Sequence, residues 1–342
     1  SSPSAADARA VVLNEIHQLG AQASPPTSDT PWWSYDAQQQ KLSARDATAS
    51  EYQLLKTARL ARMLGQLAGA TAADQRLSLL YAYQVSEAMG QPLAAEDAQR
   101  AAAFAAAEID NLLHEALNNN QISAAIACAN LLTDRGEIAS LQSIGGQRSP
   151  LARALVHPDR ELRFAALAAV MKISPTQSFA GASGVPQALW YFAAGAGTPQ
   201  AVAASSNVSR ASAWAGQLRG LGYDATPVTT GREALLTALS LPRLEVILVD
   251  SEIGRPLLRE VIFGMRSNPP LARVPVAVLY SLDHLSRAEQ LAATDAWLLA
   301  MPRPHGNEAM QFVLAQLDSK RGGKLTLARR TEQATAALGW IA

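Results

Sequence analysis

The sequence of 342 residues has little of what marks several classes of protein. Its single cysteine, Cys128, excludes an internal disulfide and any metal cluster built on cysteine, and its apolar neighbours predict a buried structural thiol. The five histidines are scattered without the spacing of metal ligands, so no metal site is expected from them. Basic and acidic residues number 29 each, and this zero net charge gives no electrostatic reason to expect a nucleic-acid partner.

Long apolar runs are also missing. No stretch approaches the roughly 20 apolar residues of a membrane helix, so no membrane partner is expected. The low cysteine content favours the cytoplasm, and a periplasmic location would follow if a signal peptide had been removed. The chain begins Ser-Ser-Pro-Ser without a methionine, and the residues before Ala342 have the pattern of a helix that is cut off. We therefore expect a fragment of a longer protein, with further helical repeats beyond its end.

Apolar residues are plentiful: hydrophobic residues make up 49% of the chain and charged residues 17%. This composition argues against disorder, and the length predicts two or three domains of about 100–200 residues each. Helical periodicity covers residues 6–19 and, in an alanine-rich form, 50–120. Between them, Trp32, Trp33 and Tyr35 follow a proline-rich linker; we expect them to anchor it on the helices, with a ligand or partner surface as the alternative. No strand pattern is found before about residue 200.

A repeat of forty residues is the clearest signal in the first part of the chain, between residues 107 and 173. The stretch 122–132 aligns with 162–172, and each is preceded by a shorter apolar helix. Two helices per unit at this spacing are typical of HEAT-type solenoids. The segment 157–166 resembles a HEAT repeat, since a Pro-Asp turn opens its second helix and Asp159 is placed to cap that helix. The resemblance implies stacked helical pairs that bind protein partners; an ordinary alanine-rich bundle is the alternative.

The period changes after a break rich in glycine, serine and proline at 175–186, a short helix at 187–196 and a predicted domain boundary near Gly197. From there to about residue 317, strand and helix patterns alternate five times with short connections. The third strand, 244–250, contains a continuous apolar run from Val246 to Val249, as burial on both faces requires, and ends in Asp250. This alternation predicts an α/β domain with a doubly wound parallel sheet.

The α/β pattern resembles the flavodoxin-like receiver domain of bacterial response regulators. The resemblance implies an acceptor Asp at the end of strand three, two acids after strand one, a Ser or Thr after strand four, and a Lys before a Pro after strand five. These groups meet at the carboxyl edge of the sheet, where such folds bind ligands. In that family the Asp is the nucleophile and the acid pair helps hold Mg²⁺, while the hydroxyl and ammonium groups contact the phosphoryl oxygens.

This chain keeps one of those groups and replaces the others. Asp250 matches the acceptor, whereas serines stand at the positions of the acid pair and Met301 stands at the position of the Lys. The pocket that the resemblance implies consists of Ser205, Ser206, Asp250, Glu252, Tyr280, Ser281 and Met301. One carboxylate among neutral groups is too little for Mg²⁺, so we expect a vacated pocket and a pseudo-receiver. Two changes would restore part of the site. The Glu252 carboxylate would supply an acid if its side chain turned into the pocket, and Arg303 would replace the Lys if the strand end shifted.

Asp250 then has two interpretations: a strand-terminal acid that caps the adjacent loop, which we favour, or a live phosphorylation site. His305 lies in a loop at the same edge, and an acid/base pair with Asp250 is a weaker hypothesis. No nucleophile and base can be paired from the sequence, and no phosphate-binding glycine motif follows a strand, so no enzyme is expected. No cofactor is expected either, apart from Mg²⁺ if the receiver site is active.

These patterns predict a multidomain chain: an α-helical domain with HEAT-like repeats at 1–197, a receiver-like α/β domain at 198–318, and a C-terminal helix at 319–342. The expected function is that of a non-enzymatic scaffold whose protein partners bind the helical repeats and the face from Tyr280 to Pro304. Two alternatives remain: a response regulator phosphorylated on Asp250, and a small-molecule sensor that uses the vacated pocket.

Overall fold

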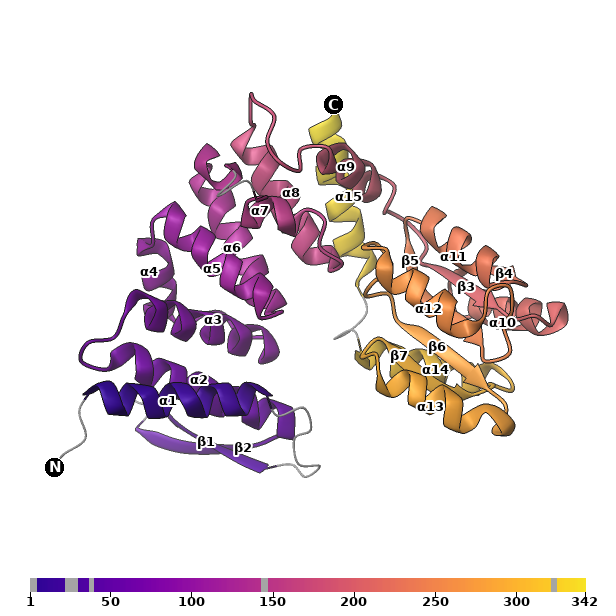
Figure 1. Ribbon diagram of the computed structural model, residues 1–342, viewed down its shortest axis with the longest axis horizontal. Helices are drawn as coiled ribbons and strands as arrows, with labels where there is room; N and C mark the ends of the chain where they lie inside the picture. Colours follow the sequence, from indigo (N-terminus) through magenta and orange to yellow (C-terminus); the bar gives the residue numbers. More distant parts are fainter. Residues whose placement is uncertain (1–4, 22–29, 37–39, 143–146, 321–324) are drawn as a thin grey trace. The chain divides into compact units, whose positions relative to one another are not determined.

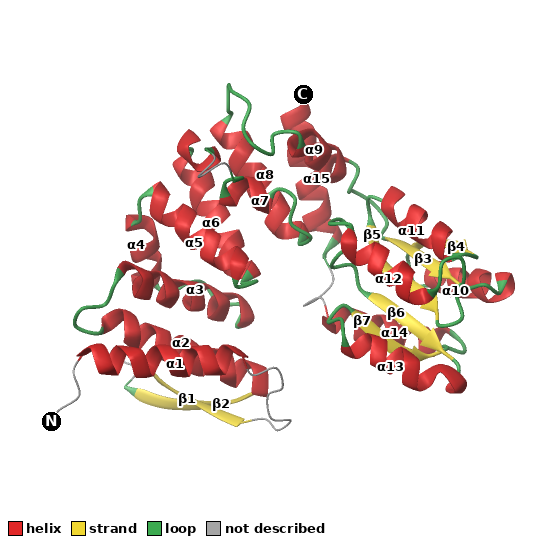
Figure 2. Ribbon diagram, viewed as in Figure 1, coloured by secondary structure: helices red, strands yellow, loops and turns green. Residues whose placement is uncertain are grey.

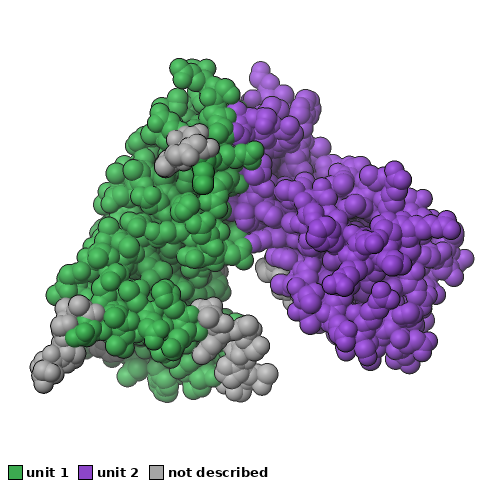
Figure 3. All heavy atoms as spheres, viewed as in Figure 1, with its two compact units in different colours: residues 1–154, 168–180 green, residues 155–167, 181–342 purple. Residues whose placement is uncertain are grey.

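The computed structural model describes residues 5–21, 30–36, 40–142, 147–320 and 325–342 of the chain. The chain forms two compact units, shown in different colours in Figure 3. The first unit holds residues 1–154 and 168–180, and the second holds 155–167 and 181–342. The chain is helix-rich, and the second unit contains a parallel five-stranded sheet.

The first unit is a succession of helices (Figure 1). They are α1 (Ala5–Ala21), α2 (Ala49–Gln66), α3 (Ala72–Ala88), α4 (Ala95–Ala103), α5 (Ala106–Asn118), α6 (Ile122–Arg135) and α7 (Pro150–Ala154), followed by α8 (Arg160–Ile173), which both units share. Helix α1 packs on α2, α2 on α3, α3 on α6, and α5 on α6. Reciprocal caps define where helices begin: Thr48 pairs with Glu51 at α2, and Thr71 pairs with Asp74 at α3.

A β-hairpin in the first unit corrects the prediction of an all-α N-terminal part without strands before residue 200. Strand β1 (Thr30–Asp36) pairs antiparallel with β2 (Lys41–Ala47), and Figure 2 shows both in yellow. Because each strand is an edge of a two-stranded sheet, Pro31 need not donate a ladder hydrogen bond. Neither strand alternates apolar and polar residues regularly, so no signal of period two marks them in the sequence.

The second unit contains the α/β domain, residues 200–320. Its strands are β3 (Gln200–Ala204), β4 (Asp224–Val228), β5 (Leu244–Asp250), β6 (Val276–Tyr280) and β7 (Leu298–Pro302). All pairings in this sheet are parallel, and the strand order is β4-β3-β5-β6-β7. Numbered within the domain, this is the order 2-1-3-4-5 of doubly wound flavodoxin-like sheets. The predicted parallel α/β sheet is confirmed.

Helices cover both faces of this sheet. They are α10 (Val208–Gly220), α11 (Gly231–Ser240), α12 (Leu258–Ser267), α13 (Leu285–Ala293) and α14 (Asn307–Lys320). One core cluster joins Ile247 and Val249 of β5 to side chains of α11 and α12, such as Val261. A second cluster joins Val246 and Leu248 of the same strand to side chains of α10 and α14. Both faces of β5 are therefore buried, which explains its continuous apolar run.

The remaining helices of the second unit are α9 (Gly184–Ala193) and α15 (Leu327–Ile341), which pack on each other. Phe164 of α8 contacts both, with its ring centroid 5.1 Å from that of Phe192 and 5.8 Å from that of Trp340. Arg330 of α15 forms a buried ion pair with Glu245 of β5. This pair ties α15 to the α/β domain, so the predicted boundaries at residues 197 and 318 both fall inside the second unit.

Candidate functional site

The candidate site lies at the carboxyl edge of the parallel sheet, where neighbouring strands end together. Asp250 is the last residue of β5, Ser205 follows the adjacent β3, and Arg303 follows β7. Arg210 comes from the first turn of α10, which Asn207 caps by accepting a hydrogen bond from the Arg210 amide. The short connections of the fold therefore bring these side chains to one point.

Asp250 is fully buried, and each of its two carboxylate oxygens accepts two hydrogen bonds. Oδ1 accepts one from the amide of Glu252 at 3.0 Å and one from Nη2 of Arg303 at 2.7 Å. Oδ2 accepts one from the hydroxyl of Ser205 at 2.8 Å and one from Nη1 of Arg210 at 2.5 Å. Because a carboxylate has about four lone-pair sites, these four donors occupy all of them.

The two arginines also contact a second acid, Glu252. Nη2 of Arg303 lies 2.8 Å from Oε1 of Glu252, and Nη1 of Arg210 lies 3.8 Å from its Oε2. The Ser281 hydroxyl donates to Glu252 Oε1 at 3.3 Å, and Nε2 of His284 lies 3.6 Å from the same oxygen. Two guanidinium groups thus balance two carboxylates, and the cluster is electrically neutral when His284 is neutral.

Hydrogen bonding sets the charge state of Asp250. Burial alone would raise the pKa of its carboxyl group, because burial disfavours the charged form. The hydrogen bonds from Arg303, the Glu252 amide, Arg210 and Ser205 outweigh burial and hold the pKa below its ordinary value of 3.8. Since the folded pKa is depressed, the carboxylate stabilises the fold at neutral pH, and this stabilisation is lost as pH falls through the folded pKa.

A pH series tests this linkage. We expect the difference in unfolding free energy between the wild type and Asp250→Asn to be largest above about pH 5 and to shrink below about pH 4. Denaturant unfolding of both proteins at each pH measures the difference. If the difference stays constant down to about pH 3, the charge of Asp250 does not contribute to stability.

Only some of the residues predicted for the pocket contact one another. Ser205 donates to Asp250, and Ser206 donates to the carbonyl oxygen of Glu252 at 3.3 Å. Met301 does not take part, because its side chain packs partly buried against the core cluster of α10 and α14. The pocket is also not vacated as predicted, since two guanidinium groups fill the space beside Asp250.

The sequence suggests one of these guanidinium groups, that of Arg303, as a replacement for the Lys after a shift of the strand end, and the other was missed. Arg303 reaches Asp250 because its amide donates to the Tyr280 carbonyl, which continues the pairing of β6 and β7 past Pro302. Arg210 was not predicted. Its one signal is its position in the first turn of the helix that follows β3, where a long side chain can fold back over the strand ends.

The donor set does not fit the Mg²⁺ ion that the receiver resemblance implies. Mg²⁺ prefers carboxylates, water and phosphate oxygens, whereas Ser205 and Ser206 stand where the acid pair would supply them. Asp250 has no unoccupied lone pair, and two cationic groups contact it. Among the described residues, no group of three or more His, Cys, Asp or Glu side chains is arranged to hold a metal ion.

An open cleft of about 620 Å³ adjoins the cluster. One face of α10, with residues at positions i, i+4 and i+7, forms one wall, and the loops after β6 and β7 form the other. The lining includes Arg210, Trp214, Gln217, Tyr280, Arg303 and His305. His305 is therefore near the site, but the four donors to Asp250 do not include it, so the pair hypothesised from the sequence is not formed.

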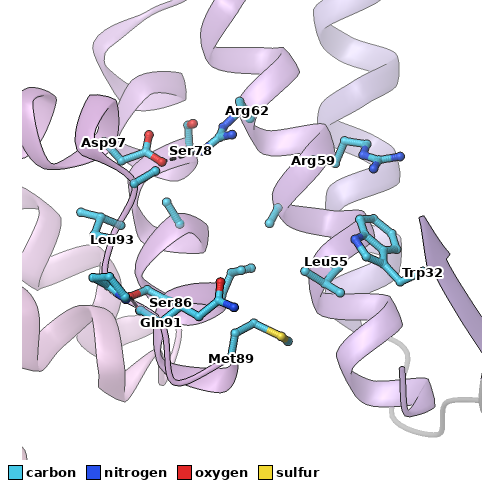
Figure 4. Close-up of a pocket in the computed structure, with 15 residues that line it drawn as sticks. Trp32, Leu55, Arg59, Arg62, Ser78, Ser86, Met89, Gln91, Leu93 and Asp97 are labelled. Atoms are coloured by element: carbon cyan, nitrogen blue, oxygen red, sulfur yellow. Dashed lines mark hydrogen bonds and ion pairs between the residues drawn. The ribbon is translucent and has the colours of Figure 1, made fainter. Parts of the chain in front are cut away.

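Trp32, in the aromatic cluster near the N-terminus, packs against α2. Its ring meets that of Tyr52 edge to face, with centroids 5.7 Å apart, and the Arg59 guanidinium lies 4.4 Å from the Trp32 ring centroid. Figure 4 shows Trp32 beside Arg59 and Leu55, at one side of a cavity of about 410 Å³ in the first unit. The side chain of Trp33 is 57% exposed. Trp32 thus acts as an anchor for its strand, whereas Trp33 faces solvent.

The other candidates carry no reactive group. Asp97, the acid in the lining of that cavity, is buried and paired with Arg62 and Arg100. Cys128 is buried as predicted, and burial raises the pKa of its thiol. In the part of the chain that the structure describes, no helix is both long and apolar enough to cross a membrane.

Comparisons with known proteins add a similarity in one region. No family model matches the chain, and no curated protein sequence matches it. The chain is similar to two solved structures of the chemotaxis response regulator CheY4 of Vibrio cholerae. The structure crystallised at pH 4.0 is 19% identical, with 35% of this chain and 99% of that protein covered and a TM-score of 0.32. The other is 20% identical with the same coverage and a TM-score of 0.31.

Proposed function

We propose that this chain is a non-enzymatic protein-interaction scaffold, in which HEAT-like helical repeats are joined to a pseudo-receiver domain. In this proposal the pseudo-receiver is not phosphorylated in the usual Mg²⁺-dependent way. The observation that supports it is the saturated carboxylate of Asp250, whose two oxygens each accept two hydrogen bonds.

Saturation matters because phosphorylation needs the carboxylate as a nucleophile. Attack on phosphorus requires an oxygen lone pair, so at least one donor, such as Arg210 or Arg303, would have to leave Asp250. Leaving would strand a guanidinium group beside a buried site, and breaking a buried ion pair costs about 3–5 kcal/mol. The same four contacts that stabilise Asp250 therefore oppose its reaction.

The proposal gives the arginines a structural role instead. Arg303 holds the loop after β7 to the end of β6 through its amide, and to Asp250 and Glu252 through its side chain. These contacts join the two ends of the face from Tyr280 to Pro304, and Leu282 on this face is 84% exposed. A surface that is already ordered loses less entropy when a partner binds. We therefore propose that this face binds its protein partner without a phosphorylation switch.

The small-molecule sensor is less well supported. It requires an open pocket at Ser205, Ser206, Asp250, Tyr280 and Ser281. Tyr280 and Ser281 line the open cleft. Ser205 and Asp250, however, are fully buried, with guanidinium groups beside Asp250. The phosphorylated response regulator remains the rival that an experiment must exclude.

Treatment of the chain with acetyl phosphate and Mg²⁺ is expected to leave Asp250 unmodified, because its lone pairs are occupied. Intact-mass and peptide mass spectrometry at neutral pH measure the modification, and Asp250→Asn is the matched control. A phosphoryl group that depends on Mg²⁺, lies on Asp250 and is absent from Asp250→Asn would overturn the proposal and favour the response regulator.

A further inference from the structure

A second cavity of the second unit lies at the opposite edge of the sheet from Asp250. The amino ends of β5, β6 and β7 line it, together with the first turn of α8 and residues of α9 and α15. Its volume is about 200 Å³. Four arginines contribute to the lining: Arg160, Arg163, Arg273 and Arg330.

Two of these arginines have only neutral partners. Arg160 donates to the side-chain oxygen of Gln333 at 2.8 Å and to the hydroxyl of Tyr191 at 3.4 Å. Arg163 is buried, with its guanidinium carbon 4.4 Å from the Tyr191 ring centroid, and its Nε has no hydrogen-bond partner among the described residues. Among those residues, no carboxylate forms an ion pair with Arg160 or Arg163.

The acids in the lining already have cations of their own. Asp159 lies 4.0 Å from Arg273, Glu161 lies 2.8 Å from Arg329, and Glu245 pairs with Arg330; these pairs leave the charges of Arg160 and Arg163 uncompensated. A buried charge without a counter-charge is costly, and two like charges three residues apart on a helix repel each other.

The titration of nearby groups indicates the same excess of positive charge. Burial alone would raise the pKa of the Tyr191 hydroxyl, but Arg163 and Arg160 hold it below its ordinary value. Burial, together with the neighbouring charge of Arg160, lowers the pKa of Arg330 to about 10. An anion bound in the cavity would act against both shifts, because it would raise the pKa of Tyr191 and that of Arg330.

We propose that this cavity binds a single phosphate group, either as inorganic phosphate or as the phosphate of a small ester. Its 200 Å³ equals about six or seven water molecules at about 30 Å³ each, which is smaller than the ~300–1,000 Å³ of most ligand pockets. The size therefore suits one tetrahedral oxyanion with a small substituent. The guanidinium groups of Arg160 and Arg163 supply paired donors whose geometry matches phosphate oxygens.

Phosphate binding to the full chain tests the proposal. Calorimetric titration and thermal unfolding at constant ionic strength compare potassium phosphate with potassium chloride. Phosphate is expected to bind saturably and to raise the Tm, whereas chloride does neither. Methyl phosphate, whose substituent is small enough for the cavity, distinguishes the two sources in a parallel titration. Tighter binding than that of inorganic phosphate assigns the site to an ester, and weaker or equal binding assigns it to inorganic phosphate.

Two matched variants locate the binding. Arg163→Gln is expected to weaken phosphate binding about tenfold or more, the effect of losing one charge-assisted contact. Arg287→Gln removes an exposed guanidinium group on α13 that neither lines the cavity nor pairs with an acid of its lining, and it is expected to change the Kd by less than about twofold. Circular dichroism checks that each variant folds; if Arg163→Gln does not, Arg273→Gln at the same cavity replaces it with the same expectation. The proposal is overturned if phosphate behaves like chloride, or if the cavity variants bind phosphate as tightly as the wild type.

Discussion

The Asp250→Ala variant is expected to lose about 3 kcal/mol of unfolding free energy in the α/β domain. The substitution removes a fully buried carboxylate and leaves the guanidinium groups of Arg210 and Arg303 without their main partner. Breaking a buried ion pair costs about 3–5 kcal/mol, and the lower end applies here. The side chains of Arg210 and Arg303 are 28% and 16% exposed, so water reaches both guanidinium groups in part. Hydrogen exchange of the β5 amides at neutral pH measures the loss.

Glu252→Ala is the matched control for this variant. Glu252 contacts the same two arginines from two residues away, but its side chain is 42% exposed, so its removal is expected to cost no more than about 1 kcal/mol.

The sign of the Asp250 effect also separates the two functional hypotheses. Residues kept for chemistry are often strained, and their removal then leaves stability unchanged or raises it. A variant Asp250→Ala that is as stable as the wild type would therefore favour a live phosphorylation site over a structural ion-pair centre.

The α/β domain was predictable because its sequence signals are strong and local. Burial on both faces forces an unbroken apolar run into β5, and the predicted bounds 244–250 are those observed. Each helix between two strands covers one face of the sheet. The hydrophobic pattern therefore changes to the period of a helix wherever the chain leaves the sheet. Asp250 at the end of β5 follows directly from this alternation.

The contents of the site were less predictable, because long side chains decide them. Arg303 and Arg210 each carry their charge several bonds from the backbone, and the sequence does not show which way such a chain turns. Ser205 and Ser206 stand where the receiver resemblance implies an acid pair, and this pattern suggested an empty pocket where two guanidinium groups lie. The acid pair of the receiver motif is thus missing here, and two arginines outside that motif supply charge at the same place instead.

Contacts between distant segments were the least predictable feature. Arg330 and Glu245 are 85 positions apart, and no pattern in either segment predicts the ion pair that joins α15 to β5. The hairpin of β1 and β2 was missed for a related reason, since its pairing depends on two short strands without an apolar period. The boundaries predicted at residues 197 and 318, from a break rich in glycine, serine and proline and from changes of period, both lie within the second unit.

Breaking the Arg330–Glu245 pair is expected to cost about 3–5 kcal/mol, whichever partner is removed. Both side chains are almost completely buried, at 5% and 2% exposure, so either Arg330→Met or Glu245→Gln leaves one buried charge without its partner. Glu245→Gln is expected to be at least as harmful as Arg330→Met, because it adds a third uncompensated guanidinium group beside Arg160 and Arg163. Hydrogen exchange of β5 and α15 peptides measures both losses.

The double variant Arg330→Met/Glu245→Gln tests whether the cost arises from the unpaired charge or from lost packing. If the unpaired charge dominates, the double variant is expected to be more stable than Glu245→Gln alone, because it removes the stranded guanidinium group. Glu332→Gln is the exposed control: its side chain, 63% exposed, pairs with Arg329 on the same helix, and its loss should cost no more than about 1 kcal/mol. A double variant that loses the sum of the two single effects would show that the two residues act independently, and the pair would then not be what holds α15 to the sheet.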